Sequence, residues 1–406
     1  MPVDTEQAET RPAEQATKCT ANTRLLGLDV LRFCAVVLVL GRHVLVPPPI
    51  WPEIPSQALQ IWKRGGWIGV DLFFVLSGFL VSGLLFGEYK SRGQFSIGRF
   101  YVRRGWKIYP PFYALIAATA AILFCKGAVI NSEELFAELV FLQSYLPAFW
   151  NHTWSLAVEE HFYLLLPLVL SLILKLNRNA TEPLRPVLPL AAGVAVLSLS
   201  MRLVNAAPYS HVTHLFASHL RLDSLFCGVA ISYLHHFHTT WFVETFSRWR
   251  AWLIFGGTLL FLPAFVFELD TTPLLYTFGF TVFYLASGAI LTGVLLCKIP
   301  HHPVVLAAAS LGAYSYSIYL WHVALKIWGV PLIEQALGTP LTYGVKITIY
   351  FAGAFLAGIA MAKIVELPAL RIRDAWFPSR ARPLTDKQEA GPALALQLVH
   401  DAAAGV

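Results

Sequence analysis

Two ionisable residues lie eleven positions apart in an otherwise apolar stretch near the start of the chain. Arg32 and His43 bracket segment 33–42, where every residue except Arg42 is apolar or glycine. On an α-helix this offset is about 1100°, close to three turns, with a rise of about 16 Å. Both side chains should therefore share one helix face. Ionisable groups inside a membrane-spanning helix mark a substrate path or a reaction site by default.

A carboxylate is expected at the depth of His43. Asp71 lies near the start of the next apolar segment, which runs in the opposite direction. If Asp71 accepted a hydrogen bond from one imidazole nitrogen, it would fix the tautomer and leave the other nitrogen as a general base. The alternative is structural, with Asp71 capping its helix and His43 resting in the membrane interface.

Further polar groups fall inside apolar segments. Glu159 and Glu160 are adjacent and point about 100° apart on a helix, so one of them should face the bundle interior. His322 ends an outward-running segment, which places it in the outer half of the membrane, as His43 is. Each group alone could serve only to hold neighbouring helices together, and so could a pair of Arg221 with Asp223. Four segments converging at one depth favour a functional site.

The opposite side carries basic residues. Arg103, Arg104 and Lys107 precede the third apolar segment, and Glu366 follows the tenth. Such runs commonly mark cytoplasmic loops, where they face lipid headgroups. The functional alternative is an anion site for a phosphate-bearing donor, with Arg32 reaching into the same cavity.

Composition indicates the scaffold that positions these groups. Of 406 residues, 56% are hydrophobic and 13% are charged, which is typical of a polytopic membrane protein and not of a nucleic-acid-binding one. The five cysteines have no CxxC spacing, and the histidines of 235–238 have no acidic or cysteine neighbour, so no metal is expected.

Ten apolar segments have spanning length. They are about 27–46, 66–86, 107–125, 153–174, 187–204, 215–234, 251–267, 275–297, 304–327 and 343–364. When the chain is threaded back and forth, the connections on one side contain most of the Lys and Arg, and those on the other contain only Lys63, Arg64 and Lys126. The positive-inside rule then predicts an all-α bundle of about ten transmembrane helices with both termini cytoplasmic, in a bacterial plasma or inner membrane.

The domain organisation follows from the same pattern. Residues 1–24 are expected to be a flexible cytoplasmic tail, 25–370 one membrane domain, and 371–406 a second flexible tail. No internal repeat is visible between the two halves of the membrane domain.

Six motifs together resemble one family over roughly residues 24–370. They are Arg32 with His43, segment 69–79 around Asp71, Arg103-Arg104 with 108–110, segment 154–163, segment 315–322 and Glu366-Leu367-Pro368. In this order they resemble the acyltransferase-3 family of integral membrane acyl-CoA-dependent O-acyltransferases. Lys107 and His161 differ from the residues that the family commonly has, Arg and Gln.

The resemblance implies roles for these residues. His43 would be the catalytic base, assisted by Asp71 and Glu160. The residues expected to bind the acyl-CoA donor, most simply acetyl-CoA, are Arg32, Arg103, Arg104, Lys107 and Glu366. Those expected to bind the acceptor are Trp154, Glu159 and His322.

The expected activity is therefore transfer of an acyl group from cytoplasmic acyl-CoA to a hydroxyl of a carbohydrate or glycolipid. With only a short tail after the membrane segments, the transfer would be completed within the helices. One alternative is the same chemistry on a small hydroxylated metabolite such as a macrolide. Another is a transporter or exporter in which the buried charges form a pathway, although the internal repeats common in transporters are not visible.

Overall fold

A computed structural model of the chain describes residues 10–205 and 207–380, with side chains from Leu26 onward. All regular secondary structure in the described part is helical. The α-helices are α1 (Thr10–Arg42), α2 (Glu53–Gly65), α3 (Ile68–Arg92), α4 (Ile97–Cys125), α5 (Ser132–Leu139), α6 (Trp154–Leu176), α7 (Val187–Val204), α8 (Leu222–Phe237), α9 (Thr239–Phe246), α10 (Arg250–Leu260), α11 (Leu262–Val266), α12 (Phe280–Leu295), α13 (Pro303–Ala313), α14 (Ser315–Ala324), α15 (Val330–Leu337), α16 (Tyr343–Met361) and α17 (Leu367–Trp376). Short 3₁₀ turns are η1 (Asn151–Thr153), η3 (Ser218–Leu220) and η4 (Ser247–Trp249), and short π turns are η2 (His211–Phe216), η5 (Leu275–Gly279), η6 (Leu325–Gly329) and η7 (Ala362–Glu366).

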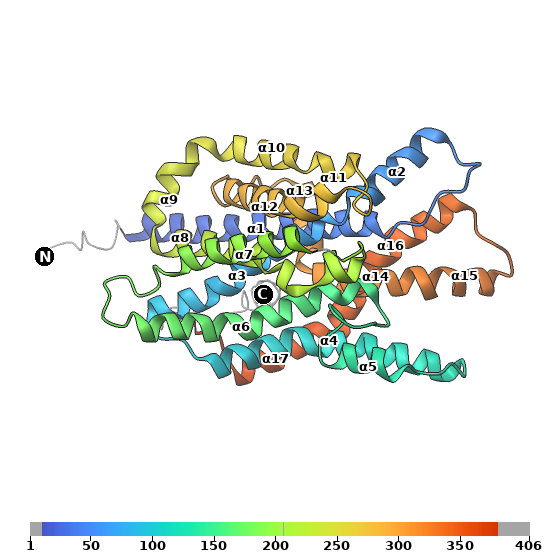
Figure 1. The fold of residues 1–406 in the computed structure, drawn as a ribbon, viewed down its shortest axis with the longest axis horizontal. Helices are drawn as coiled ribbons and strands as arrows, with labels where there is room; N and C mark the ends of the chain where they lie inside the picture. Colours follow the sequence, from blue (N-terminus) through green and yellow to red (C-terminus); the bar gives the residue numbers. More distant parts are fainter. Residues whose placement is uncertain (1–9, 206, 381–406) are drawn as a thin grey trace, which may run out of the picture.

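The long helices lie side by side along the longest axis of the molecule (Figure 1). The short helix α9 lies at one end of the bundle, which we call the α9 end. The short helices α2, α5 and α15 lie at the opposite end, which we call the α2 end. The chain therefore crosses the bundle repeatedly, as the hydropathy pattern predicted.

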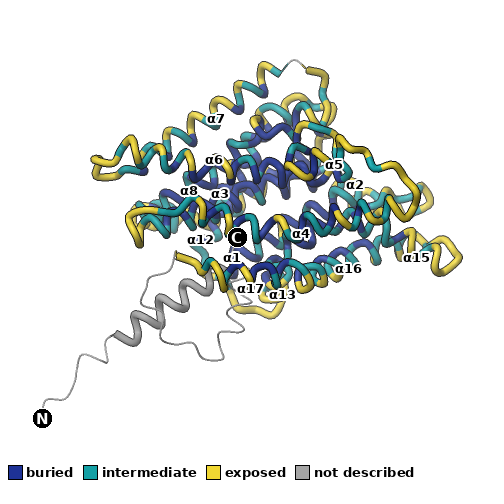
Figure 2. The backbone as a smooth tube through the Cα atoms, turned by 90° about the horizontal axis from the view of Figure 1, so that it is seen from below, coloured by how far each residue is buried: buried dark blue, intermediate teal, exposed yellow. Residues whose placement is uncertain are grey.

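Helix α3 forms the centre of the bundle. In its most apolar stretch 78% of the residues are buried inside the protein, against 22% for α7 and 17% for the span from α9 to α11. Figure 2 shows the same contrast, with α3 mostly buried and α7 largely exposed at the edge. Side chains on α3 therefore meet several helices at once, whereas α7 presents its apolar surface to lipid.

Small residues let α8 approach α3 at backbone distance. A Cβ atom on Gly78 would lie 1.9 Å from the carbonyl oxygen of Leu225, and one on Gly228 would lie 2.1 Å from that of Val75. Helix association in membranes depends on such close packing, because lipid tails are as apolar as the side chains. The two glycines therefore fix the distance between α3 and α8.

A sharp break separates helices α13 and α14. The segments Pro303–Ala313 and Ser315–Leu337 are together long and apolar enough to span a membrane, and they are bent by 68° at Tyr314. The break directs α14 into the interior, where seven of its residues are buried: Ser315, Ser317, Ile318, Tyr319, Leu320, His322 and Ala324.

All ten predicted apolar segments fall on helices. Within the described residues, seven helical segments are long and apolar enough to cross a membrane, or eight if α13 and α14 count as one span. Helices α1 and α8 are not among them, and α8 begins only at Leu222 because residues 211–220 form short turns. The number ten and the orientation of the termini stay predictions.

The predicted domain boundaries stay predictions. Helix α1 already begins at Thr10, inside the stretch predicted to be flexible, and α17 continues to Trp376, beyond the predicted boundary at 370. Arg373 is buried in that extension, because α17 packs on α4. Residues 1–9 and 381–406 lie outside the described part of the chain.

The contact between α3 and α8 gives a first prediction. Gly228→Val should lower the thermal unfolding temperature strongly, because the added carbons overlap the α3 backbone and overpacking commonly costs about 1–3 kcal/mol or more. Gly193→Val on α7 is the control, since a Cβ there has no neighbour within 4 Å. Thermal unfolding of the purified protein in detergent measures both. Equal unfolding temperatures for the two variants would contradict this packing.

Candidate active site

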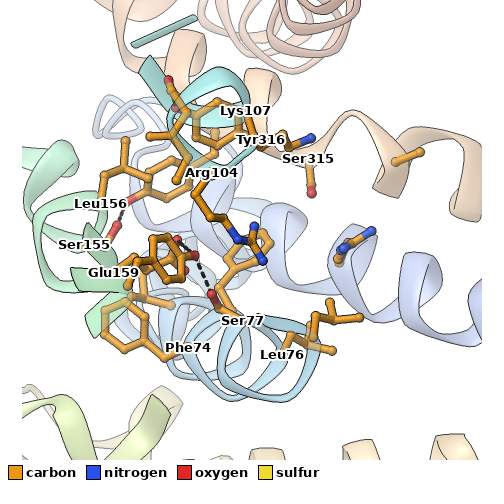
Figure 3. Close-up of a pocket in the computed structure, with 18 residues that line it drawn as sticks. Phe74, Leu76, Ser77, Arg104, Lys107, Ser155, Leu156, Glu159, Ser315 and Tyr316 are labelled. Carbon is orange, nitrogen blue, oxygen red and sulfur yellow. Dashed lines mark hydrogen bonds between the residues drawn. The ribbon is translucent and has the colours of Figure 1, made fainter. Parts of the chain in front are cut away.

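A cavity of about 100 Å³ lies inside the bundle, between α1, α3, α4, α6 and α14. A single water needs roughly 10–15 Å³ measured in the same way, so the cavity has room for several waters or a short acyl group. Its apolar wall comes mainly from α3, including Val70, Phe73, Leu76 and Leu80. Polar side chains enter it from the other helices (Figure 3).

Arg104 is the cation with hydrogens available to a ligand in this cavity. It is 6% exposed, and its guanidinium lies 5.1 Å from the centre of the Tyr163 ring. Its Nε and Nη2 have no hydrogen-bond acceptor among the described residues. Figure 3 shows the side chain extending into the space near Ser77 and Glu159. Buried unsatisfied guanidinium hydrogens are costly, so the arrangement favours an anionic or carbonyl ligand.

The other cations that line the cavity already have carboxylate partners. Lys107 Nζ lies 2.5 Å from Glu366 Oε1, and Ser317 Oγ donates to Glu366 Oε2 at 2.5 Å. Arg32 Nη1 lies 2.7 Å from Asp29 Oδ1. Glu366 therefore holds Lys107 in place, and Arg104 differs from both cations because it forms no ion pair with a described residue.

Hydroxyl groups form two short chains on the cavity wall. Ser77 Oγ lies 2.6 Å from the Tyr163 hydroxyl, which donates to Glu159 Oε2 at 2.8 Å. Ser155 Oγ lies 2.6 Å from the Tyr319 hydroxyl, which donates to the carbonyl of His152 at 2.5 Å. Tyr319 thus connects the cavity with a group of histidines behind it.

Three imidazoles meet at the α2 end of α1. The ring centres of His43 and His322 are 4.9 Å apart, and those of His322 and His152 are 5.1 Å apart. His322 and His152 are buried, whereas His43 is half-buried. The cluster therefore connects the protein interior with the surface through His43.

Hydrogen bonds assign the tautomers of this pair. His322 Nδ1 lies 2.5 Å from the carbonyl oxygen of Tyr319, so this nitrogen must carry a hydrogen. In a neutral ring the other nitrogen, Nε2, is then an acceptor, and it lies 3.0 Å from His43 Nδ1. His43 Nδ1 must donate, and it also lies 3.2 Å from the carbonyl of Val39. His43 Nε2 is left with a free lone pair, as a general base requires.

A buried carboxyl fixes the position of His152. Glu138 is fully buried, and it accepts hydrogen bonds from the Trp150 backbone N–H and the Thr153 hydroxyl, both at 3.2 Å. His152 lies between these two residues, and its Nε2 contacts the carbonyl of Leu320 at 3.1 Å. Helix α5 thereby holds the start of α6 against α14.

The predicted pair of Asp71 with His43 is wrong. Asp71 is fully buried, and its Oδ1 accepts from Arg221 Nη2 at 2.6 Å and from Ser224 Oγ at 3.4 Å. The guanidinium of Arg221 also lies 4.0 Å from the Phe280 ring centre. Asp71 therefore joins α3 to the start of α8, and His322 takes the place beside His43.

A second ion pair lies near the first. Arg202 on α7 contacts Asp223 at 2.7 Å and Thr281 Oγ1 at 2.7 Å. The predicted partnership of Arg221 with Asp223 is thus replaced by two separate pairs, which join four helices.

Three other predicted site residues point away from the cavity. Arg103 contacts Asp374 on α17 at 3.1 Å, Glu160 accepts from the Tyr109 hydroxyl at 3.1 Å, and Trp154 stacks on Phe216. None of the three lines the cavity, and neither do His43, His322 and Glu366. The predicted site residues that line it are Arg32, Arg104, Lys107 and Glu159. Adjacent helical residues point about 100° apart, and in the pairs Arg103/Arg104 and Glu159/Glu160 one member lines the cavity and the other does not.

Sequence reasoning gave no role to Tyr319 or His152, which the structure places at the centre of the site. Both lie in or next to predicted motifs, since Tyr319 belongs to segment 315–322 and His152 precedes Trp154 by two residues. Each is a polar side chain in or next to an apolar segment, which could have marked it as a candidate. The predicted depth of a residue, however, does not show which other side chains it contacts.

Comparisons with known proteins give one family match. Residues 25–363 match the model of a family described as "Acyltransferase domain". No solved structure gives a significant match to the chain.

Curated relatives are identical to this chain at about a quarter of the aligned positions. A peptidoglycan O-acetyltransferase, OatA, of Listeria monocytogenes is 27% identical over 336 residues, which cover 76% of this chain and 50% of the relative. A putative O-acetyltransferase of Staphylococcus aureus strain COL is 27% identical over 333 residues, covering 74% and 50%. The O-acetyltransferase OatA of S. aureus strain NCTC 8325 is 26% identical over 357 residues, covering 79% and 53%. The chain spans about half the length of these relatives.

The ion pair of Asp71 gives a second prediction. Asp71→Ala should lower stability by about 3–5 kcal/mol, because it leaves the buried Arg221 without its counter-ion. The double variant Asp71→Leu with Arg221→Met should recover most of that loss, since neither charge remains. Thermal unfolding compares the three proteins. A double variant as unstable as Asp71→Ala would show that the unpaired charge of Arg221 is not the cause of the lost stability.

The buried Glu138 gives a third prediction. Burial raises the pKa of Glu138 from 4.5 to about 7, so the folded protein holds this proton more tightly than the unfolded chain does. Its contribution to stability is therefore fully present below pH 4.5 and is lost as pH rises through about 7. Glu138→Gln should flatten the dependence of the unfolding temperature on pH between about 5 and 7. The exposed Glu133→Gln is the control, and equal slopes in all three proteins would contradict the assignment.

Proposed function

The chain belongs to the acyltransferase-3 family, and on that premise we propose that it transfers an acetyl group from acetyl-CoA to a hydroxyl of a carbohydrate or glycolipid acceptor. The observation that carries the proposal is the hydrogen-bond chain from the Tyr319 carbonyl through His322 to His43. It leaves His43 Nε2 as an unprotonated, half-buried base, and Tyr319 connects the histidines with the cavity that Arg104 lines. An acyl transfer to an alcohol needs both of these features.

The reaction assigns a role to each atom of this chain. His43 Nε2 takes the proton of the acceptor hydroxyl while the hydroxyl oxygen forms a bond to the thioester carbonyl carbon. The C–S bond breaks, the acetyl ester forms, and the coenzyme thiolate receives the proton from His43. His322 touches neither substrate, and it acts by holding the imidazole of His43 in the productive tautomer.

The cavity supplies the donor site in this proposal. Arg104 has free hydrogens for a phosphate or a thioester oxygen, and Arg32 lies farther along the same wall. Lys107 contributes less charge, because Glu366 neutralises it. The coenzyme enters from the α9 end, which we place in the cytoplasm because its loops carry most of the basic residues.

The volume and lining of the cavity favour a short acyl chain. The wall formed by Val70, Phe73, Leu76 and Leu80 accepts an acetyl methyl group, and about 100 Å³ leaves little room for a long chain. The relatives named above are O-acetyltransferases, which agrees with acetyl as the transferred group.

The acceptor lies on the α2 side of His43 in this scheme. One relative is named for peptidoglycan, and from it we take a cell-envelope glycan as the class of acceptor. The acceptor hydroxyl meets His43 from the surface, while the thioester arrives through the interior.

The histidine pair gives a fourth prediction. His43→Ala should abolish transfer from radiolabelled acetyl-CoA by the full-length protein in nanodiscs. His322→Ala should lower kcat by about 10²-fold or more with little change in the KM for acetyl-CoA, because it releases the orientation of the base. His322→Gln should recover part of kcat, since its amide oxygen can accept from His43 Nδ1.

The same measurement includes its control. Lys126→Ala removes an exposed charge at the α2 end, away from the histidines, and should retain wild-type kcat. Unfolding temperatures separate a loss of function from a loss of folding. Full transfer by a folded His43→Ala protein would refute the base assignment.

A further inference from the structure

A second hollow lies at the α2 end of the bundle, apart from the cavity. It has a volume of about 240 Å³, and its wall includes Arg42, Lys63 and Arg64. We call it the basic hollow. It has room for one charged group with its waters or with part of a sugar ring.

The basic hollow is lined by the residues on either side of the proposed catalytic base. Arg42 and Val44, the two chain neighbours of His43, both line it. Lys326 on η6 donates from Nζ to the His43 carbonyl at 2.8 Å, which brings another cation to the same place. A ligand in the hollow therefore lies against the chain within one residue of His43.

Most of these cations lack a counter-ion. Arg64 contacts Glu268 at 2.6 Å, so its charge is compensated. Arg42 donates to the carbonyl of Lys63 at 3.3 Å, and neither Arg42, Lys63 nor Lys326 forms an ion pair with any described residue. Burial, together with the charge of Arg42, lowers the pKa of Lys63. The three cations thus face one another at a cost that a bound anion would relieve.

The nearest other acid does not supply that anion. Asp270, in the same loop as Glu268, lies 3.7 Å from His211 and is exposed. Loops on the non-cytoplasmic side of a membrane protein usually contain few basic residues, so a concentration of them beside a catalytic base is not explained by topology.

We propose that the basic hollow binds an oxyanion, a carboxylate or a phosphate, that belongs to the acceptor. The acceptor is then an acidic sugar or a glycosyl phosphate, held by its charge so that a neighbouring hydroxyl faces His43. The inference rests on the proposed function for the role of His43. It adds the charge of the acceptor, which the family alone does not give.

Phospholipid headgroups carry the same chemistry and would compete for the hollow. Nanodiscs made only of phosphatidylcholine offer no net-anionic lipid, whereas discs with phosphatidylglycerol do. Comparing the two kinds of disc separates a sugar from a lipid as the source of the oxyanion.

The test measures binding and transfer separately on the full-length protein. The probes are a short oligogalacturonate and its carboxyl-reduced, neutral counterpart, in phosphatidylcholine nanodiscs loaded with acetyl-CoA. We expect the acidic probe to bind about tenfold more tightly or better at low salt, with the difference shrinking as salt rises. Inorganic pyrophosphate should compete with it.

Variants locate the effect. Lys63→Gln and Arg42→Gln should each weaken binding of the acidic probe about tenfold and leave the neutral probe unchanged. Lys126→Gln removes an exposed charge at the same end but outside the hollow, and it should change neither. Two independent variants guard against one that does not fold, and unfolding temperatures identify such a case.

The outcomes distinguish an acidic acceptor, a lipid headgroup and a failure of the proposed function. Equal affinity for the two probes, or no binding of either, overturns the acidic acceptor. If Lys63 is required but the only effect seen is competition with phosphatidylglycerol, the hollow binds a lipid headgroup. That outcome also overturns the acidic acceptor. If the acidic probe binds as expected while no acceptor receives acetyl from acetyl-CoA, the proposed function fails and the oxyanion site remains.

Discussion

The hydrogen bond between His322 Nδ1 and the backbone carbonyl of Tyr319 determines the chemistry of the site. A carbonyl oxygen only accepts, so it sets which nitrogen of His322 carries the hydrogen, and His322 in turn sets the tautomer of His43. Helix α14 supplies both the carbonyl and His322. The orientation of the base therefore depends on the local backbone of one short helix more than on any charged partner.

Buried charges elsewhere serve the packing of the bundle. Asp71 with Arg221, and Arg202 with Asp223, join α3, α7, α8 and α12 near the α2 end. Such pairs give little net stability over apolar substitutes, but a half-pair is strongly destabilising. They fix one arrangement of helices around the cavity, and the close contact of α3 with α8 adds a steric limit to the same arrangement.

The positions of the apolar helices could be predicted from the sequence, because a spanning helix needs a minimum apolar length and such segments are visible along the chain. The contacts of individual side chains were harder to predict from the sequence. The sequence predicted only a depth for Asp71, and depth is one coordinate; in the structure its carboxylate contacts Arg221. Arg103 and Arg104 show the same limit. They are adjacent in the sequence, yet Arg104 lines the cavity and Arg103 contacts Asp374 on α17.

The break between α13 and α14 has an electrical consequence. The first turn of any helix has amide N–H groups without intrahelical partners and carries the positive end of the helix dipole. Because α14 begins at Ser315, on the wall of the cavity, that partial charge falls inside the bundle and not at a membrane surface. In an uninterrupted helix those amides would donate to carbonyls of the preceding turn, so the 68° bend gives the cavity a fixed backbone field that adds to the charge of Arg104.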